Sequence, residues 1–167
     1  MKRLCVIVFS LAMVCFMCSC SVAEKVPEVI AAIDKNAEVE YDGLSYECHI
    51  TRLTDGVVSV GINSPENLSG LMFRQADGKF SVSCGELICK TDSITLPEIS
   101  FPIMLMKILS SASVKENLLY CSSENEIYKF TGNSDTGAYQ IFTDKTGSIT
   151  KIFQENTGLK VTFEKDK

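Results

Sequence analysis

The sequence predicts an α+β protein built on a single curved antiparallel sheet, an open half-barrel of about ten strands with two short helices. Three observations predict this fold. From residue 37 onward, apolar and polar residues alternate with the period of a half-buried strand. Short turn sequences with glycine or Asx residues separate these segments. Two further segments have helical apolar patterns, and we expect them to cover the concave face of the sheet.

The N-terminus has the pattern of an export signal. Lys2 and Arg3 precede an apolar run from Leu4 to Met17. A membrane-spanning helix needs about 20 apolar residues, whereas the apolar region of a signal peptide has about 7–15. Because the run has the length of a signal, we expect residues 1–19 to be a cleaved signal peptide.

Cys20 follows a sequence that resembles a bacterial lipobox, Met17-Cys18-Ser19-Cys20. We expect lipid to be attached to Cys20, with residues 20–25 as a short tether to the outer face of a bacterial cell membrane. Several acyl chains would hold the protein firmly there. The alternative is plain secretion after cleavage at Ser21-Val22-Ala23.

The composition excludes several function classes. The chain of 167 residues has a formal net charge of −5, which disfavours nucleic acid as a partner. The chain has a single histidine, His49, and its cysteines after residue 20 contain no Cys-x2-Cys pair, so this part of the chain has no metal pattern and we expect no cofactor. Cys48 and His49 are adjacent on a predicted strand and therefore point to opposite faces. We expect a monomeric protein that is not an enzyme.

Four cysteines remain after residue 20: Cys48, Cys84, Cys89 and Cys121. They are either free thiols, behaving as small hydrophobic residues, or two disulfides. Cys84 and Cys89 flank a predicted tight turn and are the best disulfide candidates.

The first predicted helix begins near Val26. Val26, Val29, Ile30 and Ile33 have the spacing of an amphipathic helix, and Pro27 suits its first turn. The polar residues 34–36 suit its end.

Strands follow from the alternation of apolar and polar residues. Tyr46, Cys48 and Ile50 alternate with polar residues, as do Val58, Val60 and Ile62. The predicted strands cover residues 37–42, 45–53, 56–63, 71–75, 79–84, 86–91, 118–122, 126–131, 137–143 and 148–164, the last being two strands joined by a turn.

The second predicted helix covers Phe101–Leu109. Ser100 can cap it, and Pro102 suits its first turn. The segment is apolar on nearly all sides, which is typical of a helix that is buried on more than one side. We expect it to pack inside the sheet or to cover an opening in it.

The stretch from Ser64 to Phe73 contains the pattern P-x-x-L-x-G-L-x-F, from Pro65 to Phe73. This pattern, the following hairpin and the Phe101–Leu109 helix resemble the LolA/LolB-like half-barrel, in a form seen in small exported lipoproteins of Gram-positive bacteria. The resemblance covers residues 26–167. It implies an open barrel that binds acyl chains or the lipid of another lipoprotein.

The apolar inner face is the candidate site, because no catalytic or phosphate-binding motif is present. The residues expected to line an apolar cavity are Tyr46, Ile50, Val58, Val60, Leu71, Phe73, Phe80, Val82, Phe101, Met104, Met106 and Ile108. Met104 and Met106 favour a cavity because methionine adapts to varied apolar partners. The alternative is a cell-surface interaction or sensor module with a filled core and no ligand.

Overall fold

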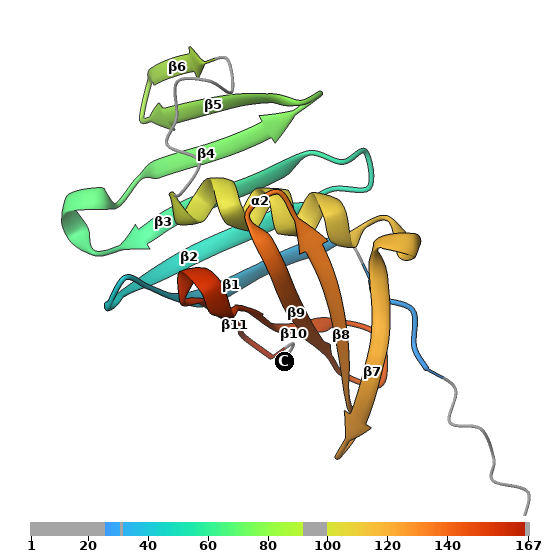
Figure 1. The fold of residues 1–167 in the computed structure, drawn as a ribbon. Coiled ribbons are helices and arrows are strands. Elements are labelled where there is room, and N and C mark those ends of the chain that lie inside the picture. Colours follow the sequence, from blue (N-terminus) through green and yellow to red (C-terminus); the bar gives the residue numbers. More distant parts are fainter. Residues whose placement is uncertain (1–25, 31, 92–99, 166–167) are drawn as a thin grey trace, which may run out of the picture.

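The computed structural model describes residues 26–30, 32–91 and 100–165, in which one sheet curves around one α-helix (Figure 1). The strands are β1 (Ile33–Tyr41), β2 (Leu44–Arg52), β3 (Val58–Ser64), β4 (Leu71–Ala76), β5 (Lys79–Cys84), β6 (Leu87–Thr91), β7 (Leu118–Glu124), β8 (Ile127–Ser134), β9 (Gly137–Thr143), β10 (Ile149–Gln154) and β11 (Leu159–Phe163). The helix is α2 (Phe101–Ala112), and short 3-10 turns cover Glu66–Leu68, Lys115–Asn117 and Glu155–Thr157.

The sheet has 11 antiparallel strands in the order β6-β5-β4-β3-β2-β1-β11-β10-β9-β8-β7. Consecutive strands are neighbours in the sheet except for β6 and β7, and the first and last strands, β1 and β11, pair in its middle. The two edges are therefore β6 and β7, and α2 lies between them in the chain. Figure 1 shows α2 crossing between the β1–β6 half and the β7–β11 half of the sheet.

The predicted strands are confirmed. Each predicted range overlaps an observed strand, and the last range divides into β10 and β11. Gly158 lies in the turn between β10 and β11. It has φ +69, a left-handed conformation that glycine adopts without a steric penalty. Alternating burial in β1, β2 and β3 places one face of the sheet toward α2 and the other toward solvent.

The inserted helix is confirmed and extends beyond Leu109 to Ala112. Ser100 is its N-cap residue and Pro102 lies in its first turn, but the Ser100 side chain makes no capping hydrogen bond. Its buried residues are Phe101, Pro102, Ile103, Met104, Leu105, Met106, Ile108, Leu109 and Ala112. The helix is therefore buried on nearly all sides by the rest of the protein, as its apolar sequence predicts.

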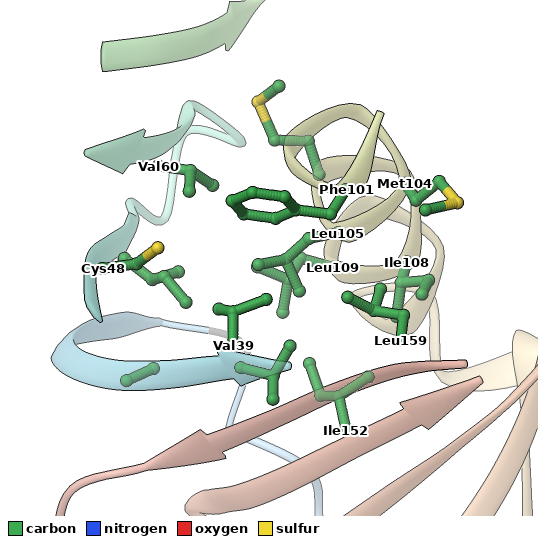
Figure 2. Close-up of a cluster of buried hydrophobic side chains, with 14 of the residues drawn as sticks. Val39, Cys48, Val60, Phe101, Met104, Leu105, Ile108, Leu109, Ile152 and Leu159 are labelled. Atoms are coloured by element: carbon green, nitrogen blue, oxygen red, sulfur yellow. The ribbon is translucent and has the colours of Figure 1, made fainter. Parts of the chain in front are cut away.

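The core lies between α2 and the concave face of the sheet. Figure 2 shows Leu105 and Leu109 of α2 directed toward Val39 of β1, with Phe101 beside Val60 of β3. Phe101 also packs on Tyr46, with ring centroids 4.6 Å apart. The helix is thus a central part of the core.

The helix predicted from Val26 is wrong. Residues 26–30 have no regular secondary structure, and Ile33 begins β1. The backbone of residues 33–36 pairs with β2 in register from Ile33↔Arg52. The amide of Ile30 donates a hydrogen bond of 2.8 Å to the carbonyl oxygen of Gly147. These long-range backbone hydrogen bonds replace the local ones that a helix would make.

The four cysteines among the described residues are free, with Cys48 buried and the other three exposed. Cys84 is paired across the hairpin with Leu87, and Cys89 with Val82. The disulfide alternative for Cys84 and Cys89 is therefore wrong. No helix in the described ranges is long and apolar enough to cross a membrane.

Cys48 is expected to be the least reactive of these thiols. Burial raises its pKa from 9.0 to about 12. We expect iodoacetamide at about pH 8 to modify Cys84, Cys89 and Cys121 in the folded protein, and Cys48 only after unfolding, because the thiolate is the nucleophile. Peptide mass spectrometry measures this. Equal modification rates at all four positions would contradict it.

The same shift predicts a pH dependence of stability. Because the folded-state pKa is raised, the unfolded chain releases the Cys48 proton first as the pH rises. The contribution of Cys48 to the free energy of unfolding is therefore complete below pH 9.0 and is lost progressively toward about pH 12.

Candidate functional site

The structure brings most of the predicted cavity residues together around α2. Nine of the twelve belong to the buried core: Tyr46, Ile50, Val58, Val60, Phe80, Phe101, Met104, Met106 and Ile108. Leu71 and Phe73 are half-buried and pack against that core, and Val82 is half-buried on β5. Whether these residues surround a ligand stays a prediction. The predicted lipidation site Cys20, the signal peptide and the 20–25 tether lie outside the described residues.

A groove of about 1040 Å³ lies elsewhere, at the C-terminal end of α2. None of the twelve predicted residues lines it. Its apolar lining includes Val26, Val29, Ile30, Leu118, Tyr120 and Phe130. Its volume is slightly above the range of about 300–1,000 Å³ that is typical of small-molecule sites.

One wall of the groove is the N-terminal segment, residues 26–30, which lies beside β7 (Figure 1). The segment is held at the turn between β9 and β10. There the Ile30 amide bonds to Gly147, and an added Cβ at Gly147 would lie 1.9 Å from the carbonyl oxygen of Glu28. Because such a distance is far below van der Waals contact, only glycine permits this approach of the two backbones.

A second wall comes from the β7–β8 hairpin. Tyr120 and Phe130 are directly paired across these strands, and their ring centroids lie 5.9 Å apart in an edge-to-face arrangement. This geometry is a favourable one for aromatic pairs. Phe130 is buried, whereas Tyr120 is 44% exposed on the edge strand. The hairpin therefore presents an apolar surface that is only partly covered by the protein.

The charged residues that line the groove are Glu28, Lys115 and Lys145. The Lys115 ammonium donates a hydrogen bond of 2.6 Å to the Glu28 carboxylate. This bond and the negative charge of Glu28 raise the pKa of Lys115. The Lys145 ammonium lies 3.3 Å from the Glu126 carboxylate.

Asp144 shapes the turn that carries Lys145 and Gly147. Its carboxylate accepts hydrogen bonds from the backbone amides of Thr146, at 2.8 Å, and Ser148, at 3.1 Å. Although burial acts to raise it, a hydrogen bond of 2.6 Å from the Thr146 hydroxyl and these two amide bonds hold the pKa of Asp144 below its ordinary value. The turn that anchors the N-terminal segment is therefore fixed by its own hydrogen bonds.

His49 and Cys48 point to opposite faces of β2, as predicted. Cys48 is buried on the concave face, while the exposed ring of His49 lies 3.0 Å from both Asp34 and Asn36. Within the described ranges, no group of three or more His, Cys, Asp or Glu side chains could hold a metal ion.

Sequence reasoning missed two sets of residues on the concave face. Tyr120 and Phe130 lie on correctly predicted strands, and their pairing follows from the hairpin register. Arg52 continues the inward series of Tyr46, Cys48 and Ile50, and it is only 7% exposed. Burial lowers the pKa of its guanidinium. Period-two counting through Arg52 would have placed this cation on the inner face.

No family model matches the chain, and no curated protein matches it. Among solved structures, an uncharacterized conserved protein from Thermus thermophilus is similar, with a TM-score of 0.47, 10% sequence identity and coverage of 80% of this chain and 77% of that chain. A LolA superfamily protein from Nitrosomonas europaea is similar with a TM-score of 0.38, 8% identity and coverage of 81% and 69%. These likenesses concern the fold alone.

Proposed function

We propose that this protein is an exported, lipid-anchored protein without enzymatic activity, and that its half-barrel binds an apolar acyl chain. The groove beside β7 carries the proposal. It combines about 1040 Å³ of space with the apolar side chains of Leu118, Tyr120 and Phe130. Ligand sites of this kind are concave and mostly apolar, with a few polar groups at defined places.

The position of the groove supports an acyl chain as the ligand. Its wall begins at Val26, six positions after the expected lipidation site Cys20. A lipid on Cys20 would keep the groove beside a membrane, where acyl chains are the nearest apolar ligands. The apolar face between α2 and the sheet is a second place for such a chain if the helix shifts.

Binding of dodecanol tests the proposal with a neutral ligand. We expect Tyr120→Gln to weaken dodecanol binding by about tenfold, because a loss of about 1.4 kcal/mol of apolar contact corresponds to a factor of ten in affinity. Isothermal titration calorimetry or displacement of a fluorescent acyl probe measures this. Native extraction followed by mass spectrometry should also recover an acyl lipid from the purified protein.

Leu87→Gln is the matched control. Leu87 is another exposed apolar residue, 76% accessible, on the opposite edge strand β6. The control should bind dodecanol as the unchanged protein does. If the unchanged protein binds no dodecanol and yields no lipid, acyl binding is wrong.

A second candidate is a cell-surface interaction module with a filled core. The observation that favours it is the exposure of large apolar side chains on both sheet edges, including Leu87 and Ile88 on β6 and Leu119 on β7. Scattered apolar residues are ordinary, but clusters on edge strands are typical of surfaces that meet another molecule. A reproducible protein partner, lost in Leu87→Gln and found without bound lipid, would favour this module.

A further inference from the structure

The groove has a charge that differs from that of the whole chain. The chain carries a net charge of −5, whereas the charged lining of the groove consists of two lysines and one glutamate. An apolar groove with cationic groups at its side is complementary to a molecule with an apolar chain and an anionic head.

Each of these lysines already contacts a carboxylate. Lys115 binds Glu28 at 2.6 Å and Lys145 binds Glu126 at 3.3 Å. The side chains in both pairs are at least 66% exposed. Because exposed ion pairs contribute little to stability, either lysine can exchange its partner for another carboxylate at a low cost.

We propose that the groove is selective for long-chain carboxylates, with Lys115 and Lys145 as the cationic groups that attract the carboxylate and the β7–β8 hairpin receiving the chain. This inference rests on the proposed acyl binding and adds the chemical class of the ligand. Glu28 then competes with the ligand for Lys115. Glu28 also belongs to the N-terminal segment, so a carboxylate at Lys115 removes one of the contacts that hold this wall.

The test compares dodecanoate with dodecanol, which have the same chain and different head groups. At about pH 8 the carboxylic acid is ionised, since free carboxyl groups have pKa values near 4. We expect dodecanoate to bind about tenfold more tightly than dodecanol, the effect of one charge-assisted hydrogen bond. Added salt should weaken the binding of dodecanoate and leave that of dodecanol unchanged.

Three variants locate the head group. Lys115→Gln and Lys145→Gln should each weaken dodecanoate binding by about threefold to tenfold and leave dodecanol binding unchanged. Glu28→Gln removes the competing carboxylate and should strengthen dodecanoate binding alone. Lys79→Gln is the matched control, because Lys79 is an exposed lysine at the start of β5 that does not line this groove.

The outcomes separate this inference from the proposed function. Equal affinities for dodecanoate and dodecanol, with no effect of the lysine variants, would overturn the carboxylate selectivity and leave acyl binding standing. Binding of neither compound would overturn both. All three variants change exposed side chains, so urea unfolding should confirm that they fold as the unchanged protein does.

Discussion

Replacing Leu105 with alanine is expected to lower the free energy of unfolding by about 2–5 kcal/mol, the usual cost of truncating a buried leucine. Leu105 is fully buried on α2 and points toward Val39 in the centre of the core (Figure 2). The cost includes the lost apolar transfer free energy and the cavity that remains. Because domains of this size are stable by only about 5–15 kcal/mol, the change should be obvious in urea unfolding followed by circular dichroism.

Ser110→Ala on the same helix is the control for the Leu105 variant. Ser110 is half-buried, and its hydroxyl donates a long hydrogen bond of 3.4 Å to Gln75. Its loss should cost no more than about 1 kcal/mol, the typical net value of one hydrogen bond. Similar small losses in both variants would show that α2 is not the centre of the core and that it can leave the sheet easily.

Gly147→Ala is expected to detach the N-terminal segment from the β9–β10 turn. The new Cβ would lie 1.9 Å from the Glu28 carbonyl oxygen, and the residue would also be held at φ +88. The backbones must separate, which breaks the hydrogen bond from the Ile30 amide. We expect amide exchange at Ile30 to accelerate by at least about tenfold, the effect of about 1.4 kcal/mol, and dodecanol binding to weaken because one wall moves.

Gly158→Ala is the control that separates the effect of a steric collision from the effect of strain at a positive φ. Gly158 has φ +69, but an added Cβ there would meet no atom within 4 Å. This control should lose about 1–2 kcal/mol of stability from left-handed strain and keep the Ile30 amide protected. If the Ile30 amide stays protected from exchange in Gly147→Ala too, the close approach of the two backbones at Gly147 is contradicted.

Local patterns were sufficient for the strands and for α2. The alternation in residues such as Val58 and Val60 is a direct consequence of one buried face. The nearly continuous apolar character of Phe101–Leu109 is a consequence of burial on nearly all sides of the helix. Both features depend on neighbours in the sequence, so sequence reasoning can recover them.

The N-terminal segment and the groove depend on distant residues instead. Val26, Val29, Ile30 and Ile33 have helical spacing, yet the Ile30 amide bonds to Gly147 and Ile33 pairs with Arg52. The groove is assembled from residues 26–30, the end of α2, the β7–β8 hairpin and the β9–β10 turn. No periodicity within one segment indicates that these four parts meet.

The pairing of β1 with β11 has a consequence for the order of folding. Ala37 is opposite Phe163, and Val39 is opposite Val161, in the middle of the sheet. The β1–β6 and β7–β11 halves can each form hairpins locally, but they join into one sheet only through contacts between strands at opposite ends of the domain. Because such non-local contacts slow folding, we expect the joining of the halves to be the late step. Until the last strand joins, the two half-sheets would leave their apolar faces uncovered, and this is the stage at which the chain is most prone to aggregation.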